Sequence, residues 1–230
     1  MKTSGFRTLF EALERLLQRR RSCRAFLAQP VDPALITRLF ALAQRTASWC
    51  NTQPWQVIVT RGAATERFRA AYINELQKGS PAPDLPFPGE YRDVYQQRRR
   101  ECARQLYESI GIAPGDRIAS QQQTLRNFSL FDAPHVAIIT SDRALGTYGA
   151  VDCGGYVANL MLAAEALGLG IIAQAALASH AAFVHRHFGI DEDRLVVCGA
   201  SFGYADPDSP ANGFYTTRAP AQETLLWHDS

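Results

Sequence analysis

The chain has 230 residues, of which 47% are hydrophobic and 20% are charged, as in an ordinary folded protein. Its 24 basic and 22 acidic residues leave a net charge of +2, which excludes a strongly basic nucleic-acid-binding protein and an acidic tail protein. The apolar fraction excludes disorder, and the length fits a single domain over residues 1–230.

The cysteines are odd in number, widely spaced and without a C-x-x-C pair. They are Cys23, Cys50, Cys102, Cys153 and Cys198. We therefore expect no disulfide framework and no zinc site, and we place the protein in the reducing cytoplasm. No apolar run approaches the roughly 18 residues of a membrane span, so we expect no membrane partner. Charged residues interrupt the first apolar segment, so we expect no signal peptide.

The first third of the chain is predicted to be mainly helical. Apolar residues at helical spacing predict an amphipathic helix over about 6–17, ahead of the basic segment that starts at Arg19. Asp32 followed by Pro33 predicts the start of a second helix. The run from Trp55 to Thr60 predicts a strand, and a third helix follows it.

A proline-rich segment separates this part from the rest. Four prolines in residues 80–89 exclude regular structure there. Two polar helices are predicted after it, over about 91–110 and 114–129, and His135–Ser141 predicts a buried strand. A mostly apolar helix over about 148–167 belongs in a domain centre or at a subunit interface. The rest of the chain is predicted as a short extended segment at about 171–173, a helix over about 179–188, a strand over 195–204 and an irregular tail from Ala205 onward.

Two familiar motifs occur in the wrong context. Gly168-Leu-Gly170 begins a match to the dinucleotide-binding fingerprint, but it closes a helix and opens a strand, which is the reverse of what that motif needs. Ser201 lies in a G-x-S-x-G match, but a proline-rich tail follows where a hydrolase needs a helix, an acid and a histidine. We interpret Gly168 as a helix-ending glycine and Ser201 as a small residue of a packed strand.

The histidines and the arginine run are interpreted as surface features. His180, His185 and His187 have no carboxylate at metal-ligand spacing, so we expect a solvated helix face. The run Arg98–Arg100 beside Glu101 is likewise expected to be a solvated face, without the interleaved aromatic residues of a nucleic-acid site.

Three separated segments remain as candidates for ligand binding. They are Arg20-Arg21-Ser22-x-Arg24, the polar turn from Ser48 to Trp55, and Arg218 in the tail. Arginines with a serine hydroxyl suit a phosphate, and amides beside a tryptophan suit a planar heterocycle. Each segment alone also fits a surface run or an ordinary turn. Together they indicate a phosphorylated planar ligand.

Two ordered motifs carry a resemblance to a known family. Arg20-Arg21-Ser22-Cys23-Arg24-Ala25-Phe26 precedes Asn51-Thr52-Gln53-Pro54-Trp55 by about 25 residues, with a proline and a helix between them. Matching stretches follow at 149–152, 159–170, 197–204 and 217–220. Across the chain, except about 79–130, the sequence resembles the nitroreductase family of FMN enzymes. This implies an α+β fold, in which helices flank a mixed, largely antiparallel sheet, and an intertwined homodimer with FMN at each of two interfaces.

The resemblance also implies roles for individual residues. It places Arg20, Arg21, Ser22 and Arg24 on the phosphate and the pyrimidine edge of the flavin, and Arg218 on the phosphate. Ser48, Trp49 and Asn51 would come from the other subunit, whereas Gln174, Ala175 and Ala176 would lie over the flavin ring. The family often has a second basic residue at the position of Thr216, a role that Arg126 is a candidate to fill.

The implied activity is reduction of a small aromatic acceptor, nitroaromatic or a related quinone or enone, by NAD(P)H in a ping-pong hydride-transfer mechanism. The flavin would carry the chemistry, so no catalytic acid or base is expected. The insert at about 79–130 would cover the substrate face, and its pattern resembles the subgroup that reduces p-nitrobenzoate and dinitroanilines. Open alternatives are a dehalogenase or flavin-cleaving member of the family, and a flavin-binding sensor or storage module without turnover.

Overall fold

The computed structural model describes residues 3–228, with side chains from Thr8 onward. Seven α-helices and four strands lie within this part of the chain. In chain order they are α1 Thr3–Arg19, α2 Pro33–Ala43, β1 Trp55–Val59, α3 Ala63–Glu75, α4 Asp93–Ser109, α5 Arg117–Leu125, β2 His135–Asp142, α6 Gly146–Ala166, β3 Gly170–Gln174, α7 Ala181–Phe188 and β4 Arg194–Gly203. Every helix and strand predicted from the sequence is present, with ends shifted by a few residues.

The strands form one sheet in the order β1-β2-β4-β3, and each neighbouring pair is antiparallel. A single parallel bridge joins Ser22 to Ile171 at the free edge of β3. This bridge matters for function because it attaches the segment after α1 to the sheet. The predicted α+β class with a largely antiparallel sheet is confirmed.

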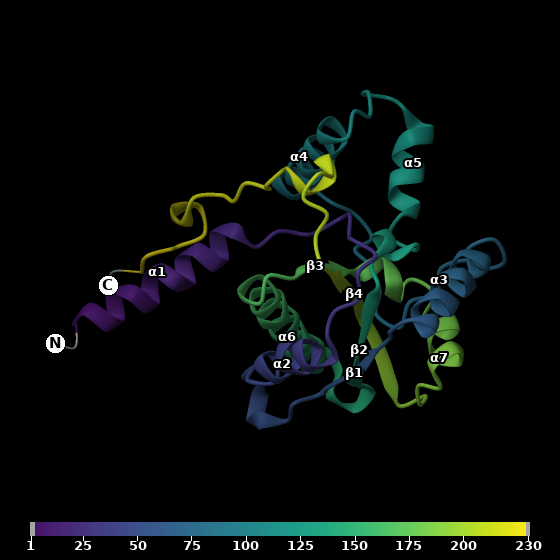
Figure 1. Cartoon of the computed structure of the whole chain (residues 1–230), viewed down its shortest axis with the longest axis horizontal. Coiled ribbons are helices and arrows are strands. Elements are labelled where there is room, and N and C mark those ends of the chain that lie inside the picture. Colours follow the sequence, from purple (N-terminus) through teal and green to yellow (C-terminus); the bar gives the residue numbers. More distant parts are fainter. Residues whose placement is uncertain (1–2, 229–230) are drawn as a thin grey trace.

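The sheet is covered on both faces. Helices α2 and α6 pack on one side, and α3 and α7 on the other (Figure 1). Strand β2 shows how the sequence builds both layers. Ala137 and Ile139 join the cluster under α2 and α6, whereas Val136 and Ile138 join the cluster under α3 and α7. Alternate side chains of a strand point to opposite faces, so a continuous apolar run serves a sheet that is buried twice.

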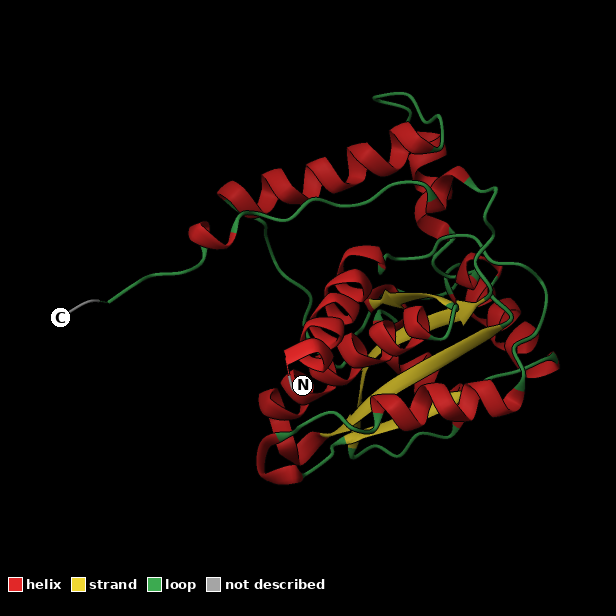
Figure 2. Ribbon diagram, turned by 60° about the vertical axis from the view of Figure 1, so that its left-hand side comes forward, coloured by secondary structure: helices red, strands yellow, loops and turns green. Residues whose placement is uncertain are grey.

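Three parts of the chain extend beyond this core. Helix α1 projects from the body, α4 and α5 stand together at one end of it, and the tail after β4 runs outward (Figures 1 and 2). Helix α4 contains no buried residue. Large apolar side chains of α1 and the tail are exposed, including Leu9 at 70% and Trp227 at 82%.

Single residues set the ends of two helices, as the sequence predicts. Helix α2 starts at Pro33, and Asp32 caps it by accepting from the Ala34 N–H at 2.7 Å. Helix α6 ends just before Gly168, whose φ of +72° is accessible to glycine at little cost. No helix between residues 3 and 228 is long and apolar enough to cross a membrane.

Candidate functional site

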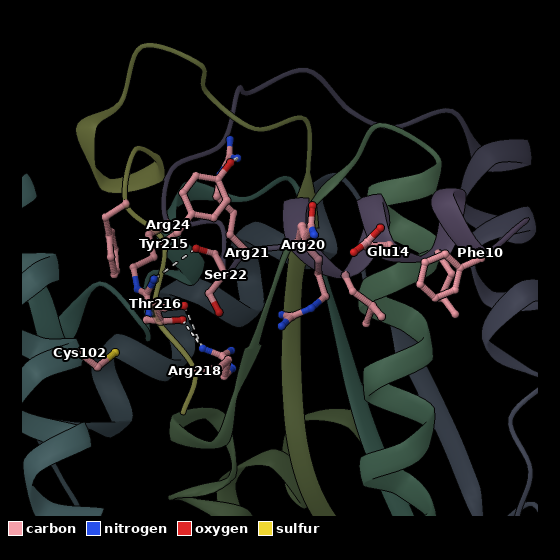
Figure 3. A pocket seen from close by; sticks show the side chains of 14 residues that line it. Phe10, Glu14, Arg20, Arg21, Ser22, Arg24, Cys102, Tyr215, Thr216 and Arg218 are labelled. Atoms are coloured by element: carbon pink, nitrogen blue, oxygen red, sulfur yellow. Dashed lines mark hydrogen bonds between the residues drawn. The ribbon is translucent and has the colours of Figure 1, made fainter. Parts of the chain in front are cut away.

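Two cavities meet at Ser22 and Arg24. The larger, of about 600 Å³, lies between the end of α1, helix α4 and the tail (Figure 3). Its lining includes Arg20, Arg21, Ser22, Arg24, Thr216 and Arg218. The smaller, of about 220 Å³, lies between α5 and the end of β3, and its lining includes Ser22, Arg24, Gln174 and Ala175. The structure thus brings together most of the residues predicted to bind one ligand.

The sheet edge positions the arginine segment. After α1 ends, the Cys23 N–H donates to the Ile171 carbonyl of β3 at 3.0 Å. The Arg24 N–H donates to Asn212 Oδ1 at 2.7 Å, and the Asn212 amide donates to the Ala25 carbonyl at 2.9 Å. Asn212 is 4% exposed and fastens the tail to this segment. This role could not be predicted from the sequence, because a single asparagine in an irregular tail carries no spacing signal.

The larger cavity has a concentrated positive charge. No carboxylate among the described residues forms an ion pair with Arg20, Arg21, Arg24 or Arg218. Burial lowers the pKa of Arg24 from its ordinary value, because desolvation disfavours the charged form. Glu14 also lines this cavity, but it forms no ion pair with these arginines. Four guanidinium groups with one carboxylate leave an excess of positive charge that suits an anion, and phosphate fits their bidentate geometry.

Neutral groups orient these arginines. Arg21 Nη1 donates to the Tyr215 hydroxyl, and Arg24 Nη1 donates to the Ser22 carbonyl at 3.2 Å. Arg218 Nη1 donates to Thr216 Oγ1 at 2.7 Å. Thr216 therefore orients Arg218 at the position where the family often has a second basic residue.

Arg126 does not fill the place of that second basic residue. Its guanidinium pairs with Asp132 at 3.0 Å, and it lines neither cavity. Arg20 and Arg21 supply the additional positive charge instead. The structure therefore does not bring Arg126 to the arginine segment of its own chain.

In the smaller cavity, the side chain of Gln174 is already engaged. Its amide nitrogen donates to the Asn127 carbonyl at 2.8 Å, and its oxygen accepts from the Ser201 hydroxyl at 2.5 Å. Ala175 lines this cavity, whereas Ala176 lines neither cavity and accepts from Ser179 Oγ through its carbonyl at 2.7 Å. The end of β3 thus contributes backbone groups to this cavity, together with the Gln174 side chain, which its hydrogen bonds hold in place.

The polar turn does not reach either cavity of its own chain. Ser48, Trp49 and Asn51 are absent from both linings. The turn is a tight 3-10 segment in which Cys50 and Asn51 have φ near +50° and +55°. It is tied to α6, because the Trp49 N–H donates to Asp152 at 3.1 Å. Strained backbone of this kind persists only where its surroundings hold it, and it clusters at functional sites.

The G-x-S-x-G match at Ser201 and the glycine match at Gly168 have structural roles, as expected. Ser201 is fully buried and donates to Gln174, so its hydroxyl is not an exposed nucleophile. Gly168 follows α6 and Gly170 opens β3, the reverse of a dinucleotide-binding turn.

The interpretation of the histidines as a solvated face is wrong. His180 is 6% exposed and bonds to Ser179, whereas His185 Nε2 pairs with Asp84 at 2.8 Å. Asp84 also accepts from the Val196 N–H at 2.8 Å, so it fastens the proline-rich segment to α7 and β4, a tertiary contact that spacing along the helix does not reveal. No cluster of metal-ligand type occurs among the described residues.

The chain is similar to known proteins over most of its length. A sequence model described as the Nitroreductase family matches residues 17–204. The chain belongs to this family. A nitroreductase named NfnB from Mycolicibacterium smegmatis is 35% identical over 217 residues, covering 94% of this chain and 92% of that protein. A nitrobenzene nitroreductase from Ectopseudomonas oleovorans is 31% identical over the full length of both.

A solved structure extends the likeness to the fold. It is the FMN-dependent nitroreductase NfnB from Mycobacterium smegmatis in complex with NADPH, with a TM-score of 0.91 and 34% identity over 96% of this chain and all of that one. The predicted nitroreductase membership and fold are confirmed. The two segments that carried the resemblance, after α1 and before β1, both fall within the matched residues.

Proposed function

We propose that this nitroreductase-family chain is an FMN-dependent oxidoreductase that uses NAD(P)H to reduce nitroaromatic compounds or related quinones and enones. The observation that supports this best is the pair of cavities that meet at Ser22 and Arg24. One has four arginines without an ion-pair partner, and the other is bounded by the end of β3 and by α5. A ligand with a planar ring and a phosphate joined by a short chain fits these two cavities, with the phosphate at the arginines and the ring in the smaller cavity. Relatives named as nitroreductases support the substrate class.

The residues of this chain fit FMN chemically. Arg20, Arg21 and Arg218 supply fixed positive charge for a phosphate, and Ser22 adds a hydroxyl. Arg24 lines both cavities, so it stands where the phosphate-bearing chain meets the ring. Bound flavin would supply the hydride chemistry. The chain binds and orients it, and Arg24 provides positive charge where the reduced ring would become negative.

We further propose a homodimer with FMN at each interface. Helix α1 leaves an apolar row uncovered in the single chain: Leu9, Phe10, Leu13 and Leu17, each at least half exposed. A row of large apolar side chains exposed together is typical of an interaction surface. The turn from Ser48 to Asn51 contacts neither cavity of its own chain, which supports its donation to the partner. The homodimer would then bury α1 and complete each flavin site.

The smaller parts of the proposal follow from the same observations. Helices α4 and α5, within 79–130, would cover the acceptor substrate, because each contributes to the lining of a cavity at the arginine segment. The cytoplasm is supported by the five cysteines, all of which are free.

The test is the visible absorption spectrum of the purified protein, before and after NADH or NADPH is added under argon. We expect a flavin band that bleaches with the nucleotide and returns with a nitroaromatic acceptor, with FMN released on heating. A flavin band that no nucleotide bleaches would favour the sensor or storage alternative. A colourless protein that does not take up added FMN would refute the proposal.

A further inference from the structure

Gln123 on α5 carries an amide group that the single chain leaves unsatisfied. It is 8% exposed, and its Nε2 is the one buried side-chain nitrogen or oxygen without a hydrogen-bond partner between Thr8 and His228. Burying a donor without an acceptor destabilises the folded state, so native proteins rarely retain one without a reason. Such a group indicates a binding partner that brings an acceptor.

The location of Gln123 identifies the kind of partner. Gln123 lines the smaller cavity together with Ser22, Arg24 and the end of β3. Two other amide side chains line this cavity, and both already donate: Gln174 Nε2 to the Asn127 carbonyl and Asn127 Nδ2 to the Thr124 carbonyl at 3.0 Å. In this cavity Gln123 is therefore the amide side chain that remains free to donate to a ligand.

We propose that Gln123 donates a hydrogen bond from Nε2 to a carbonyl oxygen on the pyrimidine edge of the flavin. This inference rests on the proposed function. It assigns a cofactor-binding role to α5, which otherwise serves only as part of the cover. A neutral donor at that edge complements the charged Arg24, and both favour the negative charge that the ring carries when reduced.

The decisive test compares Gln123→Leu with Gln122→Leu. Both substitutions have the same chemistry on neighbouring positions of α5, but Gln122 is exposed and lines neither cavity. FMN affinity is measured by fluorescence quenching after the flavin is removed. We expect FMN to bind roughly three- to tenfold more weakly to Gln123→Leu, as for one lost neutral hydrogen bond. Gln122→Leu should bind as the wild type does.

A second readout separates binding from a structural role. Because Nε2 has no partner in the protein, flavin-free Gln123→Leu should melt at or above the temperature of the flavin-free wild type. The loss of affinity should be the same for riboflavin as for FMN, since the contact is with the ring and not the phosphate. Gln123→Glu, which keeps the shape and loses the donor, should lower the reduction potential of the bound flavin.

The outcomes distinguish the two claims. If the wild type binds FMN and Gln123→Leu binds it within twofold, the inference fails while the proposed function stands. A lower melting temperature of flavin-free Gln123→Leu with an unchanged FMN affinity also overturns it, because the role is then structural. If the wild type binds neither FMN nor riboflavin, the proposed function fails and this inference fails with it.

Discussion

Arg24 offers the sharpest test of the arginine cavity, because it lines both cavities and donates there only to the neutral Ser22 carbonyl. Arg24→Ala should weaken FMN binding, since it removes a charged donor. One hydrogen bond to a charged group contributes about 1.5–3 kcal/mol, which is roughly a 10- to 150-fold change in Kd. Arg24→Lys keeps the charge but loses the forked guanidinium, so its Kd should lie between those of the wild type and the alanine variant.

The variant should fold, which makes the measurement interpretable. No described carboxylate pairs with Arg24, so its removal strands no buried anion. The lost contacts are the hydrogen bond to the Ser22 carbonyl and the guanidinium over the Phe214 ring, 5.4 Å from its centre, of which the second contributes about 0.5–1 kcal/mol. FMN titration of the flavin-free protein gives the affinity, and circular dichroism checks the fold.

Arg38→Ala is the matched control, since it removes the same charge from an exposed position on α2 outside both cavities. Its FMN Kd should equal that of the wild type. A Kd of Arg24→Ala within twofold of the wild type would refute the assignment of Arg24. An equal loss in Arg38→Ala would show that net charge, rather than the local site, governs binding.

Further predictions concern residues outside the cofactor site. Ser201→Ala should retain FMN and reductase activity, because the Ser201 hydroxyl is buried; loss of activity with an intact fold would contradict this. Asp84→Ala should lower the free energy of unfolding in urea by about 1–3 kcal/mol, since the Val196 N–H loses its acceptor at 2.8 Å. Loss of FMN instead of stability would contradict that role. Burial raises the pKa of Cys198 to about 12, so its neutral thiol adds stability below pH of about 8.5 that is lost toward pH 12. Cys198→Ala should flatten the fall in the free energy of unfolding above pH of about 9, and an unchanged slope would refute it.

Some site residues were identifiable because they are grouped in the sequence. Arg20, Arg21, Ser22 and Arg24 lie within one short segment, and an unusual density of donors there indicates an anion. Asn212 and Gln123 had no such signal. Asn212 joins the tail to the arginine segment, and Gln123 lines the smaller cavity from the polar helix α5. Their importance depends on contacts with residues far away in the sequence.

The sequence by itself determined the order of the elements and the family. The family followed from the resemblance of two ordered motifs, whereas local rules suffice for the elements: Pro33 starts a helix, Gly168 ends one, and the apolar run of β2 serves a sheet buried on both faces. The turn at Ser48 and the segment at Arg20 were likewise recognisable as motifs.

Only the tertiary structure decided which of these motifs share a site. The bridge from Ser22 to β3 brings the arginine segment beside Gln174, while the turn at Ser48 stays outside both cavities. The tertiary structure also showed that the Gln174 amide nitrogen has a hydrogen-bond acceptor and that the Gln123 amide nitrogen has none. The physical reason is that a hydrogen bond is satisfied by whichever partner the fold brings near. Spacing along the chain carries no information about partners more than a hundred residues apart.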